Sequence, residues 1–310
     1  MPETVGRGDV GALADRGDRA EFILRRLELT ITRKLAGLLH GSYEGIVPGV
    51  GSEAGESREY YPGDDVRRMD WPVTARTTVP HVRQTVADRE LETWVVHDAS
   101  PSLDLGTALM VKSELALAGL AAVVFLTVGG GNRIGALVTG TPELVRIPAQ
   151  AGTPAARVLL RRVAAQGERT ARGGVQLAEA LEALRRLPRR RGMAVVVSDF
   201  MGDDSWQDPL RALGALQDVL CIEIVDPRDL ELPDVGLLHL VDPESGAELE
   251  VQTSDASVRE RYAEAAAEQR ARIQAGIRRA QAGHLQLSTH RDWLRDIVRF
   301  VSEERRRRVR

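Results

Sequence analysis

The stretch LETWVVHDASPS, residues 91–102, decides the fold. Its apolar first part predicts a strand over residues 91–97. This strand runs straight into a carboxylate and two hydroxyls at alternate positions, Asp98, Ser100 and Ser102. Because doubly wound sheets bind ligands just beyond the carboxyl ends of their strands, the stretch predicts both a sheet and a site at its edge.

On the C-terminal side of this stretch, patterns typical of strands alternate with patterns typical of helices. Apolar spacing predicts further elements at 108–126, 134–138, 144–147, 155–165, 177–187, 193–197, 209–216, 219–225 and 237–241. Such alternation is typical of the α/β class with a doubly wound, mostly parallel sheet flanked by helices. We therefore predict that fold, preceded by a β-rich or loop segment and followed by helices.

Four segments are predicted along the chain. Leu and Ile at helical spacing give residues 1–40 a flexible start and an amphipathic helix over 21–39. Residues 41–90 form a small β and loop segment rich in Gly, Pro and charge, and residues 91–252 form the α/β domain. Residues 253–310 are predicted as a C-terminal helical extension, with helices over 258–282 and 291–304 around a short strand at 284–288.

Charge and composition narrow the classes of partner. The 310 residues carry 42 Lys plus Arg and 45 Asp plus Glu, so the charges nearly cancel. Because no aromatic residues stand among the arginines at 189–191, we predict no nucleic-acid partner. The single cysteine, Cys221, lies in an apolar run, which predicts a buried thiol. The opening residues lack the apolar core of a signal peptide, and no run of about 18 apolar residues occurs, so we predict no membrane span and a cytoplasmic location.

A metal site is one interpretation of the polar residues after the strands. The predicted strand at 193–197 ends near Asp199, which can approach the same crevice as Asp98, Ser100 and Ser102. Oxygen ligands with few carboxylates suit a hard cation, so these four residues predict Mg²⁺ or Mn²⁺ binding. The alternative is that Asp98 and the two serines cap the following helix, and both interpretations stay open.

Two motifs carry a resemblance to known families. Asp98-Ala99-Ser100-Pro101-Ser102 resembles the DxSxS start of a metal-ion-dependent adhesion site in von Willebrand factor A domains. The run REYYPGDDVRRMDW at 58–71, with Thr74-Ala75-Arg76, resembles the signature of the DUF58 family. The resemblance implies a von Willebrand factor A-like fold, Asp199 as the later site aspartate, and a MoxR-type AAA+ ATPase as the partner class. It also implies a third-loop threonine, and here Val175 stands at that position, which weakens the predicted site.

The charged block at 58–76 has a physical interpretation of its own. Tyr60-Tyr61-Pro62-Gly63 predicts a turn that holds opposite charges close together, with Trp71 as an apolar anchor beneath them. The block is either a structural ion-pair network or a partner-binding face. The residues predicted for that face are Arg58, Asp64, Asp65, Arg67, Asp70 and Arg76.

Catalysis is the second interpretation of the site. The chain has no GxSxG, HExxH, CxxC or Walker A motif. A metal-dependent phosphohydrolase using Asp98 and Asp199 needs a general acid or base, for which only His97, Asp203 and Asp204 lie near in sequence. We therefore predict a non-catalytic protein-interaction module, in which an acidic side chain of a partner completes the coordination of a bound cation.

Overall fold

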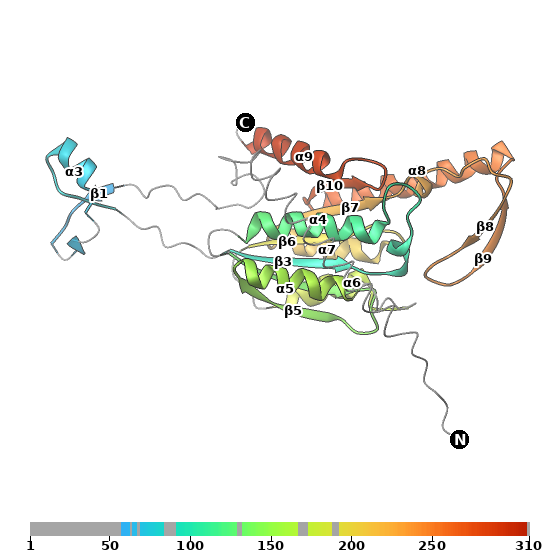
Figure 1. Cartoon of the computed structure of the whole chain (residues 1–310), viewed down its shortest axis with the longest axis horizontal. Helices are drawn as coiled ribbons and strands as arrows, with labels where there is room; N and C mark the ends of the chain where they lie inside the picture. Colours follow the sequence, from blue (N-terminus) through green and yellow to red (C-terminus); the bar gives the residue numbers. More distant parts are fainter. Residues whose placement is uncertain are drawn as a thin grey trace, which may run out of the picture.

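The computed structural model describes residues 57–62, 64–66, 69–83, 91–128, 132–166, 173–187 and 192–308 (Figure 1). The amphipathic helix predicted over 21–39 lies outside the described residues, as do the arginines at 189–191. The described part contains a main sheet with its helices, a short hairpin over residues 237–252, and a small N-terminal unit.

The main sheet has six strands. In spatial order they are β10 (Gly283–Ser288), β7 (Asp218–Val225), β6 (Gly192–Ser198), β3 (Glu92–Asp98), β4 (Arg133–Thr139) and β5 (Val145–Ala151). All neighbours run parallel except β4 and β5, which are antiparallel. The predicted α/β class with a mostly parallel sheet is confirmed.

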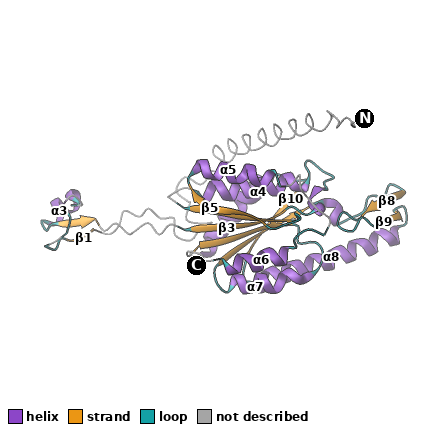
Figure 2. Cartoon of the chain, turned by 90° about the horizontal axis from the view of Figure 1, so that it is seen from below, coloured by secondary structure: helices purple, strands orange, loops and turns teal. Residues whose placement is uncertain are grey.

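Helices cover both faces of this sheet (Figure 2). One face carries α4 (Lys112–Thr127), α5 (Thr153–Ala164) and α9 (Trp293–Arg308). The other carries α6 (Leu177–Arg186), α7 (Gln207–Gly214) and α8 (Ala256–Arg279). Successive side chains of β3 enter opposite cores, since Val95 packs in the first and Trp94 and Val96 in the second. The middle of the strand, Trp94 to Val96, is therefore apolar on both faces, and the strand stops at Asp98.

The C-terminal half differs from the predicted organisation in two places. Segment 253–310 is not an appended helical extension, because β10 pairs with β7 along its whole length and α8 and α9 each pack on a face of the sheet. The strand predicted at 237–241 is confirmed as β8 (Leu237–Val241), but it lies outside the main sheet and pairs with β9 (Glu248–Gln252) in an antiparallel hairpin. Leu237, Val241 and Leu249 are exposed there, so apolar composition misled the assignment.

The small N-terminal unit joins β1 (Ser57–Glu59), α3 (Trp71–Thr77) and β2 (His81–Arg83), with β1 antiparallel to β2. Asp70 starts α3 as its N-cap, because its carboxylate accepts a hydrogen bond from the Val73 N–H at 3.3 Å. The predicted anchoring role of Trp71 is wrong, since it lies in the first turn of α3 and is 67% exposed. Val82 is the buried apolar residue of this unit.

Candidate functional site

The predicted site residues meet where β3 and β6 end. Asp98 is held from two sides, because its carboxylate accepts hydrogen bonds from the Ser100 N–H at 2.9 Å and from the Ser198 hydroxyl at 2.6 Å. The Ser100 and Ser102 hydroxyls lie 3.1 Å apart. Ser100 precedes the short helix η4 (Pro101–Asp104) but makes no side-chain capping bond to it. The capping interpretation requires the Ser100 hydroxyl to accept a hydrogen bond from this helix, and it does not.

Two glycines let the neighbouring loops approach this turn. Gly140 follows β4 with φ +73°, and a Cβ there would lie 2.2 Å from the Ser100 nitrogen. Gly174 packs on Gly140 so closely that a Cβ would lie 2.8 Å from its carbonyl carbon. The loop is fixed by hydrogen bonds from the Gly140 N–H to the Val175 carbonyl and from the Val175 N–H to the Thr141 carbonyl, both 2.9 Å. Val175 thus lines the crevice, as its place in the sequence motif requires.

A buried lysine stands beside Asp199. The Lys112 ammonium, at the start of α4, lies 2.9 Å from Asp199 Oδ2 and 3.3 Å from Asp229 Oδ2, and the Lys112 side chain is only 2% exposed. Burial alone would lower the pKa of Lys112, but the charges of Asp199 and Asp229 raise it above its ordinary value. Asp199 Oδ1 accepts a hydrogen bond from the Met201 N–H. Both oxygens of Asp199 are therefore engaged within the chain.

The crevice is a pocket of about 620 Å³ with a large excess of negative charge. Lys112 is the one basic side chain among the described residues that line it, against five acids: Asp98, Asp203, Asp229, Asp242 and Glu244. Burial, followed by the charge of Asp199, raises the pKa of Asp98. Burial also raises the pKa of Glu244, and the charges of Asp98 and Asp199 add to the shift. Such a crevice attracts cations.

Part of this crevice fits a divalent cation. Neighbouring oxygens in an octahedral Mg²⁺ shell with bonds of about 2.1 Å lie about 3 Å apart, which matches the separation of the Ser100 and Ser102 hydroxyls. Within the described ranges, no three His, Cys, Asp or Glu side chains are arranged to hold a metal ion, so a cation here depends on the serine hydroxyls. Asp98, Ser100 and Ser102 fit as ligands. Asp199 does not line this pocket, and its two oxygens accept hydrogen bonds from Lys112 and from the Met201 N–H.

The residues suggested for acid–base catalysis do not converge on this crevice. His97 is buried on β3 and does not line the pocket, and burial lowers its pKa to about 4. Asp203 lines the rim but caps the short helix η7 (Asp204–Trp206) by accepting a hydrogen bond from the Ser205 N–H. Asp204 is exposed and lies outside the pocket lining.

The charged block near the N-terminus is largely used for local structure. Asp64 accepts a hydrogen bond from the Tyr61 N–H at 2.9 Å, and Asp70 caps α3. Asp65 and Arg76 are exposed. The side chains of Arg58 and Arg67 lie outside the described residues. A partner-binding role for this block stays a prediction.

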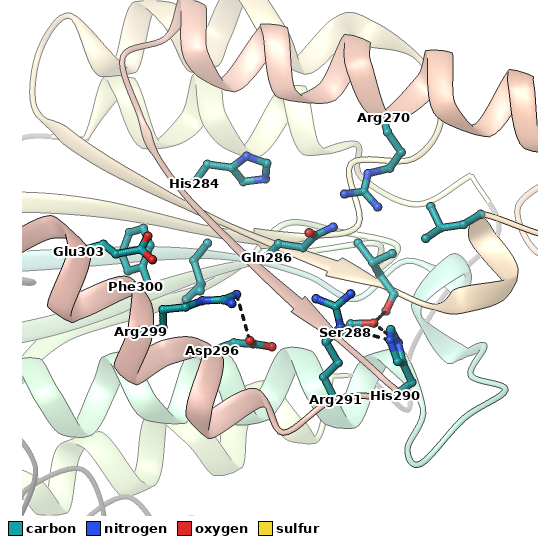
Figure 3. A pocket seen from close by; sticks show the side chains of 13 residues that line it. Arg270, His284, Gln286, Ser288, His290, Arg291, Asp296, Arg299, Phe300 and Glu303 are labelled. Carbon is teal, nitrogen blue, oxygen red and sulfur yellow. Dashed lines mark hydrogen bonds and ion pairs between the residues drawn. The ribbon is translucent and has the colours of Figure 1, made fainter.

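A second hollow, of about 320 Å³, lies between α8, α9 and the edge strand β10 (Figure 3). Its floor and walls carry several basic side chains, but most are already paired. Arg270 and His284 lie 3.2 and 2.7 Å from the buried carboxylate of Glu223, and Arg299 lies 3.3 Å from Asp296. We therefore regard the acidic crevice as the candidate functional site.

Sequence reasoning missed four charged residues of the crevice: Lys112, Asp229, Asp242 and Glu244. A charged residue at the head of the largely apolar helix sequence KSELALAGLAAVVFLT was a usable signal for Lys112, because a buried charge requires a partner. Asp229 comes from a one-turn helix, η8 (Pro227–Asp229), and Asp242 and Glu244 come from the turn between β8 and β9. No sequence pattern marks any of them.

The fold and the site define a class: a doubly wound α/β protein with a polar crevice at the carboxyl ends of its strands. The chain belongs to the family described as "Protein of unknown function DUF58", whose model matches residues 56–272. It is 52% identical over 305 residues to the uncharacterized proteins Mb1516 of Mycobacterium bovis and Rv1480 of Mycobacterium tuberculosis, covering 98% of this chain and 94% of each relative.

Solved structures with a similar course of the chain include BatB from Bacteroides thetaiotaomicron, at 14% identity and a TM-score of 0.46, covering 70% of this chain and 99% of that one. They also include the SpRpn10 VWA domain, at 13% identity and a TM-score of 0.38, covering 67% and 94%. Over the ranges that the structure describes, every helix is too short or too polar to cross a membrane.

Proposed function

We propose that this protein is a non-catalytic interaction module whose docking point is the crevice lined by Asp98, Ser100 and Ser102, with the buried Asp199 beside it. In this proposal the crevice holds Mg²⁺ or Mn²⁺, and a partner inserts an acidic side chain that completes the coordination of the cation. One observation carries the proposal: Asp98 and two hydroxyls 3.1 Å apart share an open pocket rich in negative charge.

The charge of the crevice explains why a cation is needed for this mode of docking. An acidic side chain entering alone would meet five lining carboxyl groups and one ammonium, and the ammonium already pairs with Asp199 and Asp229. Like charges at close range are repulsive, so the acid would be rejected. A bound divalent cation reverses the sign of the local field and offers an open coordination position.

The partner class rests on family resemblance. The proposal names a MoxR-type AAA+ ATPase, because proteins with the DUF58 signature are often encoded beside such ATPases. An adaptor of this kind should bind through an acidic loop of the ATPase, and binding should require the cation. Purified ATPase tested for binding with Mg²⁺ and with a chelator addresses both points.

Calorimetric titration with Mg²⁺ and Mn²⁺ tests the cation site directly. Wild type is compared with Asp98→Asn, which keeps the shape of the side chain, and with Asp208→Asn on the exposed face of α7 as a matched control. We expect binding heat in wild type and in the control, and its loss in Asp98→Asn. Absence of heat in wild type at millimolar metal would refute the cation site.

A further inference from the structure

One contact joins the crevice to a distant part of the chain. The Ser102 N–H donates a hydrogen bond to Glu244 Oε1 at 3.2 Å, although the two residues are 142 positions apart. Glu244 lies on the turn between β8 and β9, and Asp242, Pro243, Glu244 and Ser245 all line the same pocket as Asp98. In Figures 1 and 2 this hairpin stands at the end of the molecule where the parallel strands finish. The chain therefore places an acidic side chain of its own at the crevice.

The turn that carries Glu244 is built to hold one shape. Asp242 organises it, because its Oδ1 accepts a hydrogen bond from the Glu244 N–H at 3.0 Å and its Oδ2 accepts one from the Ser245 hydroxyl. Backbone bonds from the Asp242 N–H to the Ala247 carbonyl and from the Gly246 N–H to the Asp242 carbonyl close it. Glu244 is thus presented on a preformed loop.

At the base of the hairpin, Arg259 of α8 donates a hydrogen bond to the Thr253 carbonyl and lies 3.3 Å from Asp234. There Thr253 is fully buried and its N–H and hydroxyl both donate to the Gly236 carbonyl at 2.7 Å. Toward the turn, β8 and β9 pair only with each other, and Leu237, Val241 and Leu249 are exposed. Segments with few buried apolar contacts open at low free-energy cost, so the tip can leave the crevice without unfolding the sheet.

We infer that Glu244 is the internal occupant of the crevice, and that the partner docks by presenting a similar acidic loop that displaces the β8–β9 turn. The inference rests on the proposed function for the identity of the site. It adds the kind of partner segment, a short acidic turn like Asp242-Pro243-Glu244-Ser245, and a built-in competitor that the partner must displace. A competitor joined to the same chain lowers the apparent affinity by the fraction of molecules that are closed.

The electrostatics of the contact agree with a displaceable occupant. The carboxylates of Asp98, Asp199 and Asp242 lie near Glu244, so like charges surround the contact. Lys112 is the basic side chain in the described lining, and Asp199 and Asp229 already pair with it. An anionic loop with a better fit, or a cation in the crevice, shifts the balance between closed and open forms.

The contact is tested by hydrogen exchange at the Ser102 amide in the full chain. Glu244→Ala removes the acceptor, and Glu248→Ala is the matched control, since Glu248 lies on the same hairpin, is 66% exposed and pairs with His239. We expect exchange at Ser102 to rise about ten-fold or more in Glu244→Ala and to stay unchanged in Glu248→Ala. Equal exchange in the two variants overturns the inference.

The competition is tested with a cyclic peptide of sequence VDPESGA, residues 241–247, titrated in the presence of Mg²⁺. If Glu244 occupies the docking point, the peptide should bind Glu244→Ala at least about five-fold more tightly than wild type or Glu248→Ala. Equal affinities overturn the inference. Failure of the proposed function is recognised separately: wild type then binds no metal, while Ser102 exchange still responds to Glu244→Ala.

Discussion

Replacing Lys112 by methionine removes the ammonium from the crevice and keeps a side chain of similar length. In the native protein this ammonium lies 2.9 Å from Asp199 and 3.3 Å from Asp229, and the carboxylate of Asp199 is as buried as the lysine itself. After the substitution Asp199 keeps only the hydrogen bond from the Met201 N–H. A buried carboxylate without a counter-charge is strongly unfavourable.

The expected cost follows from this burial. Removing one partner of a buried ion pair destabilises a protein by about 3 to 5 kcal/mol. The carboxyl group of Asp229 is 21% exposed and can be hydrated, so we expect the lower half of that range, about 3 to 4 kcal/mol. For a chain of this size the loss corresponds to a fall in Tm of roughly 5 to 10 °C.

Urea unfolding at neutral pH measures the loss, with Arg211→Met as the control. Arg211 pairs with Asp208 at 3.2 Å, but the two side chains are 66% and 88% exposed, so its removal should cost at most about 1 kcal/mol. Combining Lys112→Met with Asp199→Asn should restore part of the stability, with a coupling energy of about 1 to 3 kcal/mol. A loss below about 1 kcal/mol for Lys112→Met, or strict additivity in the cycle, would refute the buried ion pair.

Three further predictions address the loops and the core. Gly140→Ala forces a positive φ and a clash with the Ser100 nitrogen, so it should cost at least about 1 to 2 kcal/mol in urea unfolding and abolish Mg²⁺ heat in calorimetry. Burial opposes ionisation of Asp226, but hydrogen bonds from Thr107 and others lower its pKa to about 2. Because the pKa of Asp226 is lowered in the folded state, the ionised carboxylate stabilises the fold above its ordinary pKa, and this stabilisation is lost as pH falls through about 2. We therefore expect the unfolding midpoint of wild type to fall between about pH 5 and about pH 2. The Asp226→Asn variant should lack this acid-dependent loss. Burial raises the pKa of the Cys221 thiol, so maleimide should label it only under unfolding conditions, and rapid labelling of the folded protein would contradict its position on β7.

Sequence reasoning succeeded where the signal is local. The strand at β3 and the residues at its end are encoded in one continuous stretch, and the strand before Asp199 repeats the same pattern. Because parallel strands end at one edge of a sheet, adjacency of Asp98 and the later aspartate follows once the α/β class is assigned. The order of the strands and helices, and the residues at which the strands end, therefore predict that Asp98 and Asp199 lie close together.

Sequence reasoning failed where a partner far along the chain decides the outcome. The segments of β8, LLHLV, and β10, GHLQLS, are both short, and β8 is the more apolar of the two, yet β8 forms an exposed hairpin and β10 completes the main sheet. Trp71 is exposed, as are most residues of its short helix α3, which has no buried residue. Lys112 and Glu244 reach the crevice from helix and hairpin segments whose patterns give no hint of Asp199 or Ser102.

The position of β10 at the edge of the sheet matters for any attempt to produce part of this protein. A fragment ending near residue 252 would keep β7 but lose the strand that covers its hydrogen-bonding edge. The uncovered edge would be the sequence VLCIEIV, residues 219–225, which is β-branched, mostly apolar and carries a single charge. Bare edges of this kind recruit other chains and aggregate, so such a fragment should aggregate more readily than the full chain, in which β10 covers this edge.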